Sequence, residues 1–301
     1  MAGIRLSKKD KAKQIGFILI MIFPAVAHLL IFWLGVQIES LRLAFTDYST
    51  SSWNNFANFT YSINAIFSQS NADMAEAFRN TFIFFGVLLV MLPLGLFSSY
   101  MIYKKMLFYN ILRMVLYLPG AISGILMATL YQELMMSDGP IFTILGNMGL
   151  WSGEYSFYIE KGVQYVLIYD IWLNLGGHLV IWLGTLSRIP VELLESAQLD
   201  GITPIKEFVK IVLPLIWPTF VTMITLQLIG IFGASGSILL LTGGKNHTYT
   251  LSYWLYAVVL NGSTSMYNIC AATGLIFTIA TIPLVVVGRK FLKHFGGAVE
   301  Y

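Results

Sequence analysis

Charged side chains are scarce in this sequence. Aspartate, glutamate, lysine and arginine make up 11% of the 301 residues, whereas 57% of the residues are hydrophobic. A soluble domain of this size has about a quarter of its residues charged. The mean hydropathy is +0.73. This balance excludes an ordinary soluble domain and is typical of a protein that crosses a membrane several times.

Cysteine and catalytic motifs are also nearly absent. The single cysteine, Cys270, excludes an internal disulfide and a metal site built from cysteines. Neither HExxH nor GxSxG occurs, and the glycine pair before Lys245 lacks the first glycine and the final hydroxyl of a phosphate-binding loop. The histidines are scattered: His28, His178, His247 and His294. We therefore expect no catalytic residues, no metal site and no enzymatic activity in this chain.

Long apolar runs are what the sequence does contain. A helix needs about 20 apolar residues to cross the hydrocarbon core, and its backbone amides must be satisfied within the segment. Six runs reach this length: Ile15–Ile38, Thr81–Tyr103, Ile111–Tyr131, Val163–Ser187, Leu215–Leu241 and Ile269–Gly288. The predicted fold class is an all-α polytopic membrane protein with six transmembrane helices. Two shorter apolar stretches, 140–151 and 251–260, are expected at the interface or against the bundle.

The positions of lysine and arginine predict the orientation, because these residues accumulate on the cytoplasmic side. With the N-terminus inside, fourteen lie on one side: Arg5, Lys8, Lys9, Lys11, Lys13, Lys104, Lys105, Arg113, Arg188, Lys206, Lys210, Arg289, Lys290 and Lys293. Four lie on the other: Arg42, Arg79, Lys161 and Lys245. Both termini are therefore predicted to be cytoplasmic. The net charge of +3 reflects this topology and does not indicate nucleic-acid binding.

One polar segment separates the fourth and fifth predicted spans. Residues 188–214 hold seven charged side chains and three prolines. Pro190 suits the first turn of a short helix, and Gly201 suits a left-handed turn at its end. Thr203 and Pro204 then suit the cap and first turn of a second helix. The segment is predicted to be cytoplasmic, because it joins two spans on the basic side.

The second short helix is predicted to be amphipathic. Its apolar residues recur at helical spacing: Ile205, Phe208, Val209, Val212 and Leu213. Pro214 is expected to end it at the entrance of the fifth span. Two capped helices around a glycine turn favour a docking surface for a cytoplasmic partner. The alternative is an ordinary solvated loop between two spans.

The polar segment resembles the EAA loop of permease subunits of ATP-binding-cassette importers. The family pattern is E-A-A, three residues, G, nine residues, then I-x-L-P. The matching residues are Glu195, Ser196, Ala197, Asp200, Gly201, Ile211, Leu213 and Pro214, with Ser196 as the one departure. SLRLAFTDYS (residues 40–49) and LTGGKN (residues 241–246) are similar to elements of maltose-type permeases. The chain is thereby identified as resembling the carbohydrate-uptake branch of the family.

This resemblance implies a transport subunit that is driven by other chains. The EAA loop would form a coupling helix in a cleft of a separate ATPase, which would carry the ATP and Mg; this chain itself would hold no cofactor. Glu195 would be the acidic anchor, Gly201 would permit the turn, and Asp200 would brace it. The implied partners are a second homologous permease chain (a heterodimer), two ATPase subunits and an extracellular or periplasmic substrate-binding protein. The implied location is the cytoplasmic (inner) membrane of a bacterium or archaeon.

Polar residues inside the spans are candidates for the substrate pathway. Asp170 is the clearest, and it shares a helical face with Asn174 and Gly177. Carboxylate and amide groups suit sugar hydroxyls, and aromatic rings suit the apolar face of a sugar. The family resemblance points to the same helix, in which Asp170 and Asn174 depart from the family pattern. The candidates are Asp170, Trp172, Asn174, Gly177, His178, Gln227, Gly230, Gly233 and Ser235.

Several alternatives stay open from the sequence. Asp170 can instead pair with a polar group of a neighbouring helix, and His178 can be a hydrogen-bonded packing residue. The series Gly230, Gly233 and Gly236 can serve close helix packing. A standalone secondary transporter that uses Asp170 as a proton or ion site is the alternative function. Three regions are expected along the chain: a cytoplasmic tail at 1–14, a permease domain at 15–292 with its coupling loop at 188–214, and a cytoplasmic tail at 293–301.

Overall fold

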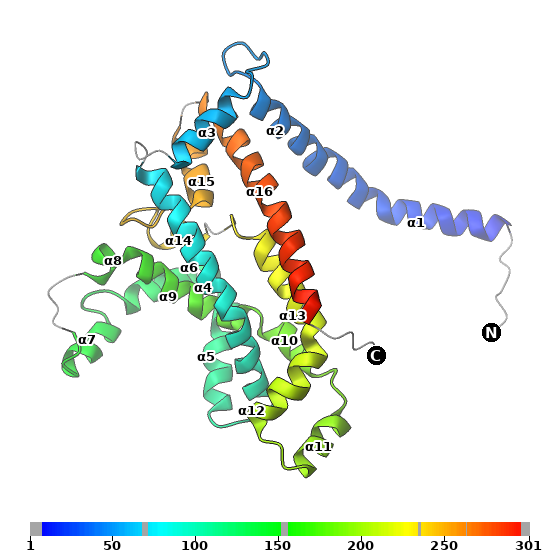
Figure 1. Ribbon diagram of the computed structural model, residues 1–301, viewed down its shortest axis with the longest axis vertical. Helices are drawn as coiled ribbons and strands as arrows, with labels where there is room; N and C mark the ends of the chain where they lie inside the picture. The colour runs from blue at the N-terminus through cyan, green and yellow to red at the C-terminus, as the bar shows by residue number, and fades with distance from the viewer. Residues whose placement is uncertain (1–7, 68–71, 152–155, 234–235, 263, 296–301) are drawn as a thin grey trace. The chain divides into compact units, whose positions relative to one another are not determined.

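The computed structural model is built from helices. It describes residues 8–67, 72–151, 156–233, 236–262 and 264–295. Within these ranges the chain forms helices and turns, with an isolated bridge between Thr46 and Trp53 in place of a sheet. The chain divides into two compact units: residues 1–63 with 262–276, and residues 64–261 with 277–301. The all-α prediction is confirmed, and Figure 1 labels the helices.

The first unit contains one long helical stretch made of three consecutive segments, and parts of two other helices. They are α1 (Lys8–His28), the π-helical η1 (Leu29–Leu34), α2 (Gly35–Phe45), α3 (Ala57–Phe67) and α16 (Met266–Phe295). α3 and α16 each continue into the second unit. Large apolar side chains are exposed along α1 and η1; Phe23 and Phe32 are 69% and 64% exposed. A helix that is apolar on all sides is typical of a membrane span.

A turn after α2 is held by polar side chains. Asn58 donates to the carbonyl oxygens of Ala44 and Thr46 at 3.1 and 3.0 Å, and Asn268 of α16 donates to the Thr46 carbonyl at 2.7 Å. The Ser49 hydroxyl and the backbone amides of Thr50 and Ser49 hold the pKa of Asp47 below its ordinary value. These bonds order the stretch that resembled a family element.

The second unit contains the remaining helices. They are α4 (Ala72–Tyr103), α5 (Tyr109–Ala121), α6 (Gly124–Leu134), α7 (Pro140–Asn147), α8 (Phe157–Glu160), α9 (Gly162–Gly177), α10 (Leu179–Leu186), α11 (Val191–Leu199), α12 (Pro204–Glu207), the π-helical η2 (Phe208–Val212), α13 (Leu213–Ile229), α14 (Gly236–Leu241) and α15 (Leu251–Asn261). α9 packs against both α4 and α5. Gly176 permits this approach to α5, because a Cβ there would collide with the carbonyl of Leu116.

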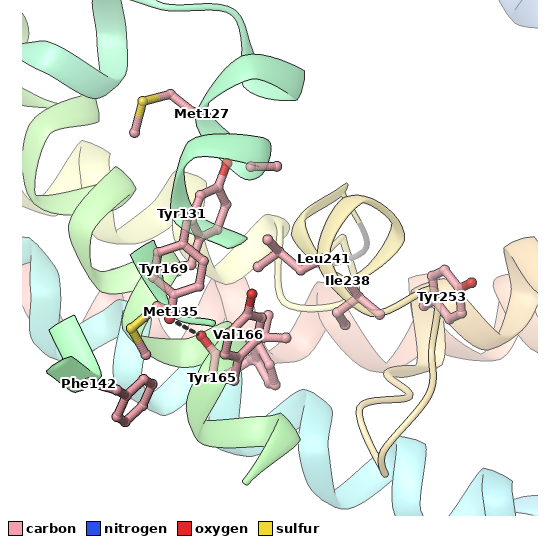
Figure 2. Close-up of a cluster of buried hydrophobic side chains, with 12 residues drawn as sticks. Met127, Tyr131, Met135, Phe142, Tyr165, Val166, Tyr169, Ile238, Leu241 and Tyr253 are labelled. Carbon is pink, nitrogen blue, oxygen red and sulfur yellow. Dashed lines mark hydrogen bonds between the residues drawn. The ribbon is translucent and has the colours of Figure 1, made fainter. Parts of the chain in front are cut away.

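An aromatic core joins α6, α9, α14 and α15 (Figure 2). Tyr131 and Tyr165 lie with ring centroids 5.0 Å apart, and the Tyr131 hydroxyl donates to the Tyr165 carbonyl at 2.7 Å. Tyr169, Ile238 and Tyr253 belong to the same cluster. The hydroxyl hydrogen bond matters because a buried phenol without a partner is costly. This core places α9, and with it Asp170, in the interior of the unit.

The six predicted spans are not all reproduced as single helices. Within the described ranges, five helical segments are long and apolar enough to cross a membrane: Lys13–Phe45, Met74–Tyr103, Gly162–Leu186, Pro204–Ile229 and Met266–His294. The count of six is therefore not confirmed. The short apolar stretches predicted outside the spans form α7 and α15, and α15 packs against α4 as expected.

In the part of the chain that the structure describes, two predicted spans, Ile111–Tyr131 and Leu215–Leu241, do not form one helical segment long enough to cross a membrane. Ile111–Tyr131 divides into α5 and α6, because Ile122 is extended and Ser123 caps α6 by accepting a hydrogen bond from the Leu126 amide at 3.4 Å. A serine is a strong N-cap even within an apolar run. Leu215–Leu241 divides after Ile229, where Gly230 forms the C-cap of α13. Uniform hydropathy concealed both breaks.

Candidate functional site: the loop between α10 and α13

The polar segment forms two short helices around a tight turn. α11 begins at Val191, and Pro190 is its N-cap residue, so the prediction that Pro190 lies inside the first turn was wrong by one position. Glu192 lies in the first turn, where a negative charge interacts favourably with the helix dipole. Figure 1 shows α11 and α12 at the same end of the second unit as the connection between α4 and α5.

The turn between the helices has the predicted left-handed residue. Gly201 has φ +71°. Its amide bonds to the Gln198 carbonyl at 3.0 Å, and the Ile202 amide bonds to the Ala197 carbonyl at 3.2 Å. This pair of bonds defines the Schellman motif that ends a helix. A Cβ on Gly201 would meet nothing within 4 Å, so backbone conformation alone requires glycine there.

α11 presents its polar side to solvent. Glu195, Ser196 and Asp200 are exposed. Leu194 and Ala197 are buried, and Leu194 belongs to the core cluster that contains Trp182 and Ile216. Ala197 therefore packs inward, whereas the two other residues of the E-S-A triplet remain available to a partner.

The loop also exposes apolar side chains. Leu199 is 90% exposed, Ile205 65% and Val209 52%. Val212, which recurs with Ile205 and Val209 at helical spacing, is by contrast 1% exposed. Exposed apolar residues of this kind mark a surface that contacts a protein partner or the membrane. Periodicity identified the helix but did not show that it carries two apolar faces.

The second short helix does not end at Pro214. Thr203 is extended and Pro204 starts α12 as predicted, although the Thr203 side chain makes no capping hydrogen bond. α12 continues through η2 into α13, with Pro214 in the first turn of α13. The π turn of η2 is a single turn inserted in a longer helical path, and that path continues through Pro214. Ile211 and Leu213 are half-buried along this path, and Pro214 is exposed.

Glu207 was not among the residues predicted from the sequence. This residue ends α12 and is 1% exposed. Its carboxylate contacts the Lys104 ammonium group at 2.9 Å and the Tyr100 hydroxyl at 3.0 Å. No local pattern reveals such a contact, since Lys104 is 103 residues away in sequence. In the sequence, the lysine pair Lys104 and Lys105 was the only feature that could have indicated this contact. From the sequence, this pair was explained entirely by its place on the cytoplasmic side of the membrane.

Asp170 lies in the interior of the second unit. It is 6% exposed, and its carboxyl group interacts with the side chain of Ser237 in α14. Ser237 was not among the predicted residues; Ser235, which was, lies outside the described residues. The neighbouring aromatic residues are Tyr169 and Tyr131 of the same core. The contact with Ser237 matches the alternative in which Asp170 pairs with a polar group of a neighbouring helix.

The other predicted residues of α9 form bonds within the protein. Trp172 donates to the Val115 carbonyl at 3.2 Å, and Asn174 donates to the Asp170 carbonyl at 2.8 Å. The His178 ring lies 3.4 Å from the Asn174 carbonyl. Gly177 ends α9, and His178 separates it from α10, so the helix breaks directly after Gly177. These bonds match the packing alternative for His178.

The predicted residues after Phe220 lie near the end of α13. Gln227 is half-buried, Gly230 caps the helix, and the Gly233 amide bonds to the Gly230 carbonyl at 2.8 Å. These two glycines form a turn, so the close-packing alternative does not describe them. Among the described residues no group of three or more histidine, cysteine or acidic side chains is placed to hold a metal ion.

The comparison with protein families gives a match that includes the loop and α9. Residues 91–300 match the model described as "Binding-protein-dependent transport system inner membrane component". The chain belongs to this family. Its members are membrane components of transport systems and not enzymes. The secondary transporter based on Asp170 is accordingly not favoured.

Individual relatives cover nearly the whole chain. A probable starch degradation products transport system permease protein, AmyD of Thermoanaerobacterium thermosulfurigenes, is 25% identical over 93% of this chain and 96% of its own length. The arabinooligosaccharides permease AraP of Bacillus subtilis is 24% identical, with coverage of 91% and 88%. A chain of the crystal structure of a bacterial alginate ABC transporter has the same fold, with TM-score 0.79, 23% identity and coverage of 96% and 99%.

Proposed function

We propose that this chain is a permease subunit of an ATP-driven sugar importer and forms half of its translocation pathway. Relatives that span almost the whole chain are named for the transport of starch degradation products and arabinooligosaccharides. A sugar, most simply an oligosaccharide, is therefore the proposed cargo. Family membership from residue 91 onward supports the transport role.

The observation that best supports this proposal is the geometry of the loop between α10 and α13. A Schellman turn at Gly201 separates two short helices, and Glu195, Asp200 and the apolar Leu199 are exposed beside it. We propose that this surface docks into a separate ATPase, with Glu195 as its acidic anchor. Ala197 and Leu194 hold α11 to the core, so a force applied to the exposed side reaches the membrane helices.

Further chains complete the proposed importer. A second permease chain completes the pathway, two ATPase subunits carry the ATP and Mg, and a binding protein outside the membrane delivers the sugar. A solved structure with the same fold is that of a bacterial alginate ABC transporter in complex with an alginate pentasaccharide-bound periplasmic protein, and this supports the last of these partners. The bias of lysine and arginine supports cytoplasmic termini in an inner-membrane protein.

Asp170 is the proposed centre of the substrate pathway. It is buried beside Ser237 within the tyrosine-rich core. The accompanying residues proposed from the sequence are Trp172, Asn174, Gly177, His178, Gln227, Gly230, Gly233 and Ser235. The hydrogen bonds of Asn174 and His178 to their own helix make these two the weaker members.

A substitution at the turn tests the coupling role. Gly201→Val places a β-branched side chain at φ +71°, a conformation that such residues rarely adopt. We expect the variant to insert into the membrane but to lose sugar uptake and to bind the ATPase more weakly. The measurements are mild-detergent purification with mass spectrometry of bound chains, and uptake of a radiolabelled mixture of malto- and arabino-oligosaccharides.

Gly184→Val is the matched control, because Gly184 lies within α10 and a Cβ there meets nothing within 4 Å. Normal uptake by Gly201→Val would contradict the coupling role. Purification of the unaltered chain without an ATPase, while other membrane complexes stay intact, would overturn the importer assignment. Uptake that persists without ATP and collapses with the proton gradient would instead favour secondary transport through Asp170.

A further inference from the structure

A buried ionic contact joins the loop to the end of α4. The Glu207 side chain is 2% exposed and that of Lys104 is 16% exposed, with Nζ 2.9 Å from Oε1. The same nitrogen donates to Oε2 at 3.1 Å. One ammonium group therefore engages both oxygens of the carboxylate, and little water reaches the pair.

Tyr100 adds a second connection to the same helix. Its side chain is fully buried, and its hydroxyl lies 3.0 Å from Glu207 Oε1 and 3.1 Å from the Pro204 carbonyl oxygen. Both of these atoms accept hydrogen bonds, so the single hydroxyl proton is shared between them. Pro204 and Glu207 are the first and last residues of α12, so Tyr100 holds both ends of this helix to α4.

Aromatic packing surrounds the polar contact. Phe208, which follows Glu207, lies edge-on to Phe97 with ring centroids 5.3 Å apart, and 5.0 Å from the Tyr100 ring. These rings belong to α4 and to the start of η2. The apolar surroundings lower the local dielectric, which strengthens the attraction between the charges.

A contribution to stability does not by itself explain why a buried ion pair is present here. Burying two charges carries a desolvation cost, and well-packed apolar residues of similar volume often serve stability equally well. An ionic contact differs in being directional and specific to one partner. α4 in turn packs along α9 and α10, and α9 carries Asp170. The contact therefore lies between the docking loop and the helix of the proposed pathway.

We propose that Glu207, Lys104 and Tyr100 form a positioning cluster that makes α12, η2 and the end of α4 move as one body. Displacement of the loop by the ATPase is then passed to α4 and through it to α9. This inference rests on the proposed function and adds the residues through which the loop acts on the bundle. Glu207 touches neither ATP nor sugar in this proposal; it transmits movement through Lys104.

The test uses the complete transporter, with its ATPase, second permease and binding protein, in proteoliposomes. The quantity measured is oligosaccharide transported per ATP hydrolysed, with the radiolabelled malto- and arabino-oligosaccharide mixture as the probe. We expect Glu207→Gln and Lys104→Met to lower this ratio about tenfold, within the range of typical coupling between sites, while the ATPase still co-purifies. Lys105→Met is the matched control, because Lys105 is the adjacent exposed lysine.

Two further variants keep the test decisive. The double variant Glu207→Lys with Lys104→Glu is expected to recover most of the ratio that Glu207→Lys alone loses. Tyr100→Phe removes only the hydroxyl, and we expect a smaller decrease even if Glu207→Gln assembles poorly. A wild-type ratio in assembled Glu207→Gln or Lys104→Met, or no recovery by the double variant, would overturn the cluster. Failure of the unaltered chain to bind an ATPase would instead overturn the proposed function.

Discussion

The two short helices on either side of Gly201 use their acidic residues in opposite ways. Glu195 of α11 is exposed to solvent, whereas Glu207 of α12 is 1% exposed and paired with Lys104. Both residues belong to one polar segment of the sequence. The difference shows that one loop can have a half that faces a partner and a half that is anchored to its own bundle.

Apolar residues follow the same division. Leu199 at the end of α11 is 90% exposed, whereas Val212 in η2 is 1% exposed and packs in the cluster with Trp182. An exposed leucine is unfavourable in an isolated chain, because its apolar surface contacts water. A partner that covers the leucine removes this surface from water and thereby stabilises the complex. The comparison therefore separates residues that stabilise this chain from residues that serve an assembly.

The largest effect on stability is expected at the anchored half. Glu207→Ala leaves the Lys104 ammonium group buried without its counter-charge, which typically lowers the free energy of unfolding by about 3–5 kcal/mol. Thermal unfolding of the purified chain in detergent measures the change. Glu192→Ala is the control, since Glu192 is exposed. Equal melting temperatures for the two variants would remove the distinction between the halves.

An intermediate effect is expected at the turn between the halves. Gly201→Ala places a Cβ in open space but at φ +71°, and the left-handed conformation costs an alanine about 1–2 kcal/mol. Gly184→Ala, in a helix with equally open space, should instead be neutral or slightly stabilising. A Gly201→Ala chain as stable as the unaltered one would mean that the turn relaxes. The same unfolding experiment distinguishes these outcomes.

The smallest effect on stability is expected at the exposed half. Glu195→Gln removes a solvated charge and should change the free energy of unfolding by no more than about 0.5 kcal/mol. Recovery of the ATPase with the purified chain should nevertheless decrease, because the proposed anchor has lost its charge. A variant that is destabilised, or one that binds the ATPase normally, would contradict the assignment of Glu195 to a partner.

Local features of the loop could be predicted from the sequence. Where a prediction about a helix boundary was wrong, the cause lies in one or a few neighbouring residues. Gly201 was expected in a left-handed turn and has φ +71°, because no other residue adopts that conformation so readily. Pro214 was expected to end a helix, but it lies in the first turn of α13, which continues directly from η2. Ser123 was concealed inside an apolar run, and it starts a new helix there. Hydropathy averages over such single residues.

The linear sequence was enough to predict that the chain is helical, apolar and built for a membrane, and that a glycine turn divides its one polar segment. These properties depend on composition and on neighbouring residues, which are visible along the chain. The burial of Glu207 against Lys104 and the position of Asp170 beside Ser237 became visible only in the folded chain. Burial and ion pairing depend on helices that packing brings together, and 103 residues separate Lys104 from Glu207.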